Sequence, residues 1–195
     1  MSLKMGVALL VLAALPLGAQ QQAGTAKVAS ATKRTTPAAG NAGAKIASAM
    51  SAAPSRIASA ATIAEIGPDG KIVTLRAGTN GFTCFPDDPN TPKADPICAD
   101  KAWGQWFEAW MAKKPPVTRQ VGIAYMLQGA SDASNTDPFA TKPPAGADWV
   151  NTPAHTMVIV PDPKQLDSYP SDPKSGGPFV MFKGTPYAHL MVPTH

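Results

Sequence analysis

The sequence has few of the residues, and none of the motifs, on which common catalytic sites depend. Of its 195 residues only Glu65 and Glu108 are glutamates, and only three are histidines. It contains no G-x-S-x-G nucleophile motif, no H-E-x-x-H zinc motif and no glycine-rich phosphate loop. The sequence therefore gives no support to the familiar hydrolase, zinc-protease and nucleotide-binding classes.

Cysteine is equally scarce, because the chain has only Cys84 and Cys98. An isolated pair in an exported protein is most simply a disulfide. The bridge would close a proline-rich loop of about 15 residues, which the chain-entropy model values at about 3 kcal/mol. A thiol pair for metal or redox chemistry is the alternative, but the spacing is neither C-x-x-C nor that of a zinc knuckle.

Long apolar runs are missing after residue 19, so we expect no transmembrane segment in the mature chain. Residues 1–19 combine Lys4, an apolar stretch over 6–17 and Ala19 at a cleavage position, which is typical of a secretory signal peptide. There is no cysteine at the cleavage point itself, which argues against a lipid anchor. We expect a periplasmic or secreted protein.

Acidic residues are absent from 20–62, which carry five Lys or Arg residues, whereas residues 63–195 have a net charge of −2. The sequence predicts a tail over 20–60, disordered to about residue 43 and weakly helical beyond it, followed by one globular domain over 61–195. The tail is a solvated linker or makes weak contacts with anionic envelope surfaces. No patch combines basic and aromatic residues, so we expect no nucleic-acid partner.

The strongest structural pattern is the segment 100–114, DKAWGQWFEAWMAKK. Its large apolar residues recur at the spacing of one helix face. Asp100 is a candidate N-cap, and Pro115 follows two lysines as a stop signal. We expect a helix that buries this stripe against a sheet. The residues of the stripe are Trp103, Trp106, Phe107, Trp110 and Met111.

Six short strands accompany this helix, and their connections are mostly too short for parallel crossovers. The sequence thus predicts an α+β domain in which one tryptophan-rich helix covers a small, mainly antiparallel sheet; a mostly β sandwich is the alternative. The expected strands cover residues 61–66, 71–76, 120–128, 156–160, 179–183 and 187–192.

The motif His-x-Met occurs twice, as His155 with Met157 and as His189 with Met191. Each motif lies on an expected strand, where alternate side chains share a face. If the two strands are neighbours, two imidazoles and two thioethers could converge on copper, particularly Cu(I). The alternative is that the methionines fill the core and each histidine binds a backbone carbonyl.

The loop after residue 130 carries a second candidate set, Asp132, Asn135 and Asp137. Their side-chain oxygens could bind a hard cation such as calcium. The loop lacks the glycine and the distal glutamate of an EF-hand, and the same residue types are ordinary turn formers. A local turn is therefore the competing interpretation.

Five segments resemble a group of exported bacterial proteins generally labelled hypothetical: RIASAA, GTNGFTCFPDDP, QWFEAWMAKKPP, VGIAYMLQGASDASNTDP and VMFKGTPYAHLMVP. The likeness covers about residues 56–193, and its most distinctive part is the closing GTPYAHLMVP. That group has no established activity, fold or ligand. The resemblance implies export and a single domain, and it transfers no catalytic residue.

These observations favour an exported, non-enzymatic domain of binding or structural type without a cofactor. One alternative is a periplasmic copper-binding protein that uses the two His-x-Met motifs. Another is a secreted enzyme in which His189 acts as a general acid or base. The positions of His155 and His189 in the fold distinguish these hypotheses.

Overall fold

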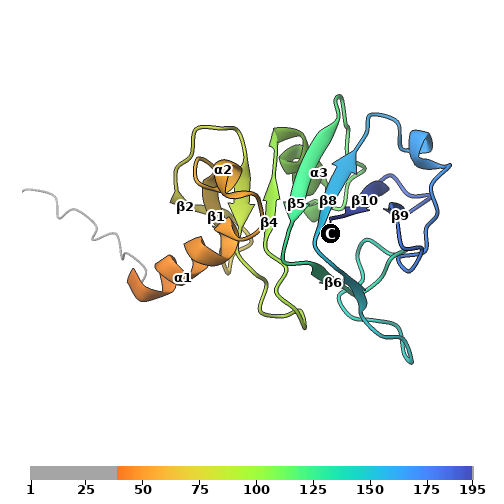
Figure 1. The fold of residues 1–195 in the computed structure, drawn as a ribbon, viewed down its shortest axis with the longest axis horizontal. Coiled ribbons are helices and arrows are strands. Elements are labelled where there is room, and N and C mark those ends of the chain that lie inside the picture. The colour runs from red at the N-terminus through yellow and green to blue at the C-terminus, as the bar shows by residue number, and fades with distance from the viewer. Residues whose placement is uncertain (1–38, 195) are drawn as a thin grey trace, which may run out of the picture. The chain divides into compact units, whose positions relative to one another are not determined.

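The computed structural model describes residues 39–194, which form a mixed α+β fold (Figure 1). The helices are α1 (Ala39–Met50), α2 (Ser55–Ala58), α3 (Lys101–Met111) and the 3-10 helix η1 (Pro163–Leu166). The strands of the larger sheet are β1 (Thr62–Ile66), β2 (Ile72–Arg76), β3 (Thr83–Phe85), β4 (Ile97–Ala99), β5 (Gly122–Met126), β8 (His155–Ile159), β9 (Phe179–Met181) and β10 (His189–Pro193). A smaller sheet pairs β6 (Ala130–Asp132) with β7 (Val150–Thr152).

The eight strands of the larger sheet lie in the order β2-β1-β3-β4-β5-β8-β10-β9. Only β1 and β3 are parallel, and every other neighbouring pair is antiparallel. The expectation of a mainly antiparallel α+β fold is confirmed, but the expected number of six strands is too low. The strands absent from the sequence prediction are β3, β4, β6 and β7, which have three residues each and so give almost no alternation pattern.

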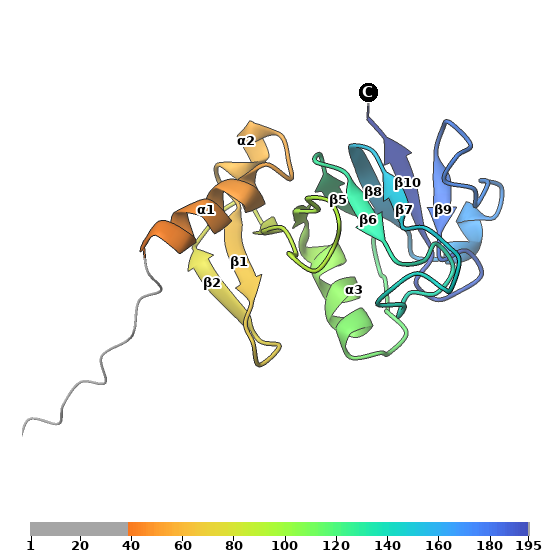
Figure 2. The same ribbon diagram turned by 90° about the horizontal axis from the view of Figure 1, so that it is seen from below.

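The helices cover opposite faces of the larger sheet (Figure 2). On one face α1 and α2 pack against β1, β3 and β4, where Ile63 and the two cysteines are buried. On the other face Trp103 and Trp106 of α3 pack against Met157 and Met191 of β8 and β10. Adjacent residues Cys98 and Ala99 belong to different cores, because successive side chains of a strand point to opposite faces. The long helices therefore cover opposite faces in the two halves of the sheet.

Helices α1 and α2 belong to the fold, although the sequence prediction assigns residues 39–60 to the tail. Small buried side chains at Ala49, Ala52 and Ala58 allow both helices to approach the sheet closely. Pro54 separates the helices and directly precedes the first residue of α2. The predicted signal peptide and the predicted disordered segment before residue 39 lie outside the described residues. Residues 39–43, the last part of that predicted segment, belong to α1.

Helix α3 follows the sequence prediction closely. The Asp100 carboxylate accepts the Trp103 backbone N–H at 2.9 Å as an N-cap, and its second oxygen accepts the Ile123 N–H at 2.7 Å. This one side chain therefore fixes both the start of α3 and its position beside β5. The helix ends at Met111, ahead of the two lysines and Pro115.

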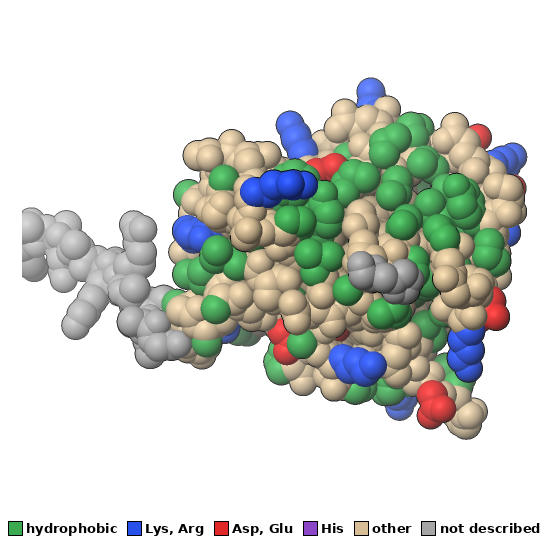
Figure 3. Space-filling model, viewed as in Figure 1, with side chains coloured by type: hydrophobic (Ala, Val, Ile, Leu, Met, Phe, Trp, Pro, Cys, Tyr) green, Lys and Arg blue, Asp and Glu red, His purple; other side chains and the backbone are tan. Residues whose placement is uncertain are grey.

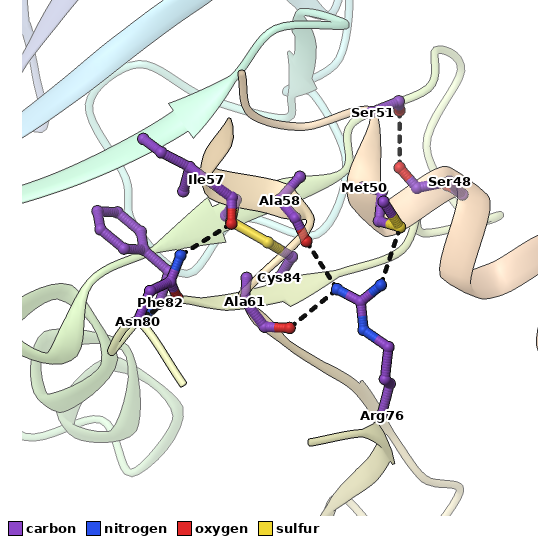
Figure 4. Close-up of a disulfide and its surroundings, with 11 residues drawn as sticks. Ser48, Met50, Ser51, Ile57, Ala58, Ala61, Arg76, Asn80, Phe82 and Cys84 are labelled. Carbon is purple, nitrogen blue, oxygen red and sulfur yellow. Dashed lines mark hydrogen bonds between the residues drawn. A yellow bond between two sulfur atoms is a disulfide. The ribbon is translucent and has the colours of Figure 1, made fainter. Parts of the chain in front are cut away.

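Cys84 and Cys98 are joined by a disulfide between directly paired residues of β3 and β4 (Figure 4). Both cysteines are fully buried beneath α1 and α2. Arg76 of β2 closes this region, because its guanidinium donates to the backbone oxygens of Ala58 and Ala61 at 2.7 and 3.0 Å. The bridge, the two helices and the first strands thus form one packed unit.

The face of β9 and β10 opposite α3 carries a small third core, in which Leu166 of η1 packs against Val180, Ala188 and Leu190. Strands β8 and β10 also present the half-buried Val158, Leu190 and Val192 on this face, and Figure 3 shows apolar side chains gathered over these strands.

The two edges of the larger sheet differ. The outer edge of β9 is bonded to loops, because the N–H groups of Val180 and Phe182 donate to the backbone oxygens of Pro170 and Asn135. Strand β2, at the opposite end, has β1 as its one neighbour.

Candidate functional site

A groove of about 210 Å³ lies between α3 and the strands β1–β4. It forms because α3 packs on β5, β8, β9 and β10, and leaves the same face of the earlier strands open. Its wall combines threonine side chains from three strands with aromatic rings, namely Thr62, Thr74, Thr83, Phe85, Trp103 and Phe107. Glu108 is the one charged residue among those lining the groove. Such a lining suits an apolar group that also accepts a few hydrogen bonds from hydroxyls.

Gly104 lies in the middle of α3 and lines this groove. Outside its own helix and chain neighbours, no atom lies within 4 Å of the position that a Cβ would take. A glycine inside a helix costs about 1 kcal/mol relative to alanine, so the residue is unfavourable for the helix itself. Packing does not account for it, and its effect is to widen the groove.

The second candidate region is the face of β8 and β10 that α3 covers. The register places Met157 directly opposite Met191, whereas His155 is opposite Pro193. His189 pairs on its other side with Met181 of β9. The two histidines are thus offset by four residues along the strands, which is about 13 Å at about 3.3 Å per residue. The structure brings the two predicted methionines together but not the two predicted histidines.

The two imidazoles are hydrogen-bonded to different backbone carbonyls. His155 Nδ1 lies 2.7 Å from the Pro153 oxygen, and His189 Nδ1 lies 3.0 Å from the Tyr187 oxygen. Each ring is therefore held by the residue that precedes its own strand. Because the strands are antiparallel, these two anchoring residues lie at opposite ends of the strand pair. The hydrogen bonds of the two imidazoles therefore anchor them at opposite ends of the strand pair.

His189 sits among aromatic rings and not in a polar cleft. Its ring centroid lies 5.2 Å from that of Trp103, 5.6 Å from Trp106 and 5.5 Å from Phe182, each in an edge-on arrangement. Burial is the main reason that the pKa of His189 is lowered to about 4; the Tyr187 carbonyl opposes this shift, and His155 makes a smaller contribution in the same direction as burial. No carboxylate in residues 39–194 hydrogen-bonds to this imidazole. It is a neutral side chain at pH 7.

The loop after residue 130 gives its three predicted ligands different roles. Asp137 Oδ1 accepts the Phe139 N–H at 2.9 Å in a local turn, and Asn135 Nδ2 donates to the Ser171 oxygen at 2.6 Å. Asp132 instead ends β6, where its Oδ2 is buried without a hydrogen-bond partner. Burial raises the pKa of Asp132 to about 7, with a smaller contribution from the charge of Asp95.

Within residues 39–194 there is no cluster of three or more His, Cys, Asp or Glu side chains that could hold a metal ion. None of the helices described has the length and apolarity needed to span a membrane.

Sequence reasoning missed Gly104 and Met126 as candidate site residues. Met126 lies on β5 directly opposite His155, so it shares the α3 side of the sheet with Met157 and Met191. Its position at the end of an apolar strand gave a signal, but the register that pairs it with His155 joins segments about 30 residues apart. The glycine was visible as a break in helix propensity within the tryptophan stripe.

Comparison of the chain with protein-family models, with curated proteins and with solved structures finds no match.

Proposed function

We propose that the chain is a non-catalytic binding domain whose ligand is an extended polypeptide segment with an aromatic or branched apolar residue. The observation that carries the proposal is Gly104, which keeps open a groove that an ordinary helix residue would narrow. A position that costs helix stability without a packing reason is expected where a ligand must enter. The open space beside Gly104 is part of the same groove that Trp103 and Phe107 line.

The size of the groove supports a single side chain as the group that is bound. Pockets for drug-sized molecules have volumes of about 300–1,000 Å³, and this groove is smaller. It does have room for one aromatic ring or one branched aliphatic side chain. The aromatic walls supply dispersion and ring contacts, and the threonine hydroxyls can bond to polar atoms beside the ring.

The position of strand β2 at the edge of the sheet is the reason for proposing an extended polypeptide as the ligand. It is an edge strand, and its Ile72 and Thr74 line the groove. A segment that adds to this edge gains main-chain hydrogen bonds, and its alternate side chains point to the face on which the groove lies. Main-chain pairing at β2 and one apolar side chain beside α3 therefore form one continuous binding surface.

Export is part of the same proposal. The disulfide between Cys84 and Cys98 supports it, because such bonds persist in oxidising compartments and are rare in the cytosol. A role for His189 in acid–base catalysis finds less support, since the imidazole is enclosed by aromatic rings and is hydrogen-bonded to a backbone carbonyl.

The test is an NMR titration of the isotope-labelled protein with the peptide acetyl-Thr-Val-Phe-Val-Thr-amide. We expect shifts of the amides of β2 and of the first half of α3. Gly104→Phe places a ring in the groove without a backbone clash and should weaken binding by at least about tenfold, or about 1.4 kcal/mol.

The matched control is Gly43→Phe, which changes a helix glycine with equally open surroundings on α1. It should leave the titration unchanged. Shifts confined to another surface, or equal affinity of the wild type and Gly104→Phe, would contradict the proposal. If acetyl-phenylalanine amide binds as tightly as the peptide, the groove takes a small molecule and β2 has no part in binding.

A further inference from the structure

We infer that His155, Met126, Met157 and Met191 form a binding site for Cu(I) on the side of the sheet that α3 covers. This set differs from the pair of His-x-Met motifs, since Met126 takes the place of His189. The site is separate from the groove beside α3, and it does not depend on the proposed function.

The atom that points to a ligand is Nε2 of His155. The side chain is fully buried, and this nitrogen has no hydrogen-bond partner. The hydroxyl of Thr152, three residues earlier, is also buried but forms no bond to it. An unsatisfied buried polar atom costs about 1–3 kcal/mol, so a native core rarely retains one without a reason.

The protonation state of the ring suits a metal. A carbonyl oxygen only accepts hydrogen bonds, so the 2.7 Å contact with Pro153 requires that Nδ1 carries the proton. The lone pair is then on Nε2, the atom without a partner. A backbone carbonyl on the far nitrogen is the usual second contact of a metal-binding histidine, where it fixes both the tautomer and the ring orientation.

The strand register places three methionines near His155, on its own strand and on the two neighbouring strands. Met126 is directly opposite His155 on β5, Met157 is two residues along β8, and Met191 is directly opposite Met157 on β10. Opposite side chains in a sheet have Cβ atoms about 4.5–5.5 Å apart, and diagonal neighbours are about 7–8 Å apart. Methionine has three rotatable bonds and reaches across these spacings.

The donor set selects the metal. Thioether sulfur is a soft ligand and imidazole is intermediate, a combination that favours Cu(I) over Zn(II), calcium or magnesium. Met157 and Met191 are buried in the core beneath Trp103 and Trp106, whereas Met126 is half-buried at the end of β5. An ion would thus enter at Met126 and reach a site shielded from water. Core filling explains buried methionines, but it does not explain the free nitrogen of His155.

The test is a competition titration of the purified, disulfide-bonded protein with the chromogenic Cu(I) chelator bicinchoninate, under anaerobic conditions with ascorbate. We expect one Cu(I) per chain. Met126→Leu, Met157→Leu and Met191→Leu should each weaken binding at least about tenfold while the protein stays folded, because leucine nearly conserves the methionine volume. X-ray absorption of the copper-loaded protein should give three sulfur neighbours and one nitrogen.

Two controls separate these ligands from the other buried side chains. Met181→Leu changes a buried methionine of the same core, and His189→Gln removes the other histidine; both should leave the affinity unchanged. The inference fails if the wild type takes no Cu(I) from the chelator or if Met181→Leu weakens binding as much as Met157→Leu. It also fails if loss of His189 abolishes binding while Met126→Leu has no effect, which would restore the ligand set expected from the sequence motifs.

Discussion

The carboxyl group of Asp132 is buried, and burial strongly raises its pKa. Its pKa of about 7 means that the folded protein keeps the proton at pH values where the unfolded chain, with a pKa of 3.8, has lost it. The free energy of unfolding therefore falls as the pH rises from about 4 to about 7, and it stays reduced above pH 7. Stability is lost because the ionised carboxylate has its Oδ2 buried without a hydrogen-bond partner.

We predict that Asp132→Asn stabilises the protein at pH 8 by about 1–3 kcal/mol, and has little effect at pH 4, because an amide of the same shape carries no charge to bury. Urea unfolding at pH 4, 6 and 8 measures the difference. The exposed Asp148→Asn is the control, with changes within about 0.5 kcal/mol at each pH. Equal effects of Asp132→Asn at pH 4 and pH 8 would show that its carboxyl is not titrating between them.

At the residue scale, the sequence predicts a helix cap more directly than it predicts which side chains of neighbouring strands lie together. Asp100 was recognisable because a cap and its helix are neighbours in the chain. The copper set included His189 because a repeated motif suggests equivalent positions, yet the register offsets the two motifs. Met126 enters the proposed Cu(I) set only through the pairing of β5 with β8, which no local pattern specifies.

At the level of elements, α3 shows how unevenly one apolar stripe is buried. Trp106 is 6 % exposed and lies in the main core, whereas Trp110 is only partly buried and donates its indole N–H to the Pro138 oxygen at 2.6 Å. The stripe thus faces the sheet at its first turns and a loop at its last. Helix periodicity identifies the apolar face but not the distance of each turn from the sheet.

We predict that Trp106→Ala destabilises the protein by about 3–5 kcal/mol, the usual cost for a buried aromatic residue. Trp110→Ala should cost less, about 1–3 kcal/mol, because part of its surface is already in water and the lost hydrogen bond contributes about 1 kcal/mol. Chemical denaturation of both variants provides the comparison. A larger loss at Trp110 than at Trp106 would mean that the loop contact, and not the sheet contact, holds α3 in place.

The length of a strand affects whether it can be recognised in the sequence. Strands β1, β2, β5, β8 and β10 have five residues each, enough for their apolar character to stand out. Strand β9 has only three residues, but the turn residues Gly176 and Gly177 just before it indicate where it starts. Strands β3 and β4 are recognisable only through the disulfide that joins them, since prolines dominate the loop between them. The sequence predicts only marginal helical turns in the region of α1, because alanine side chains bury little apolar surface. In the structure these small side chains allow the helix to pack closely on the disulfide.

At the level of the whole molecule, export and the disulfide belong to one prediction. Protein recovered from an exporting host should begin near Gln20, and the unfolded, unreduced form should have no titratable thiol. The first expectation follows from the signal peptide predicted over 1–19, and the second from the bond between Cys84 and Cys98. Intact-mass spectrometry and thiol titration are the measurements. A mature species that starts at Met1 would refute export, and two free thiols would refute a stable bridge.

The unequal edges of the larger sheet limit how copies of this domain can associate. Loops occupy the outer edge of β9, whereas β2 keeps its outer edge free in the part of the chain described. Two copies that pair β2 with β2 in an antiparallel manner would form one continuous sheet about a two-fold axis. Since each copy contributes its free edge to that contact, neither end of the joined sheet could recruit a third copy in this way. Such association would stop at the dimer, and the geometry that admits one added strand would thereby oppose growth into fibres.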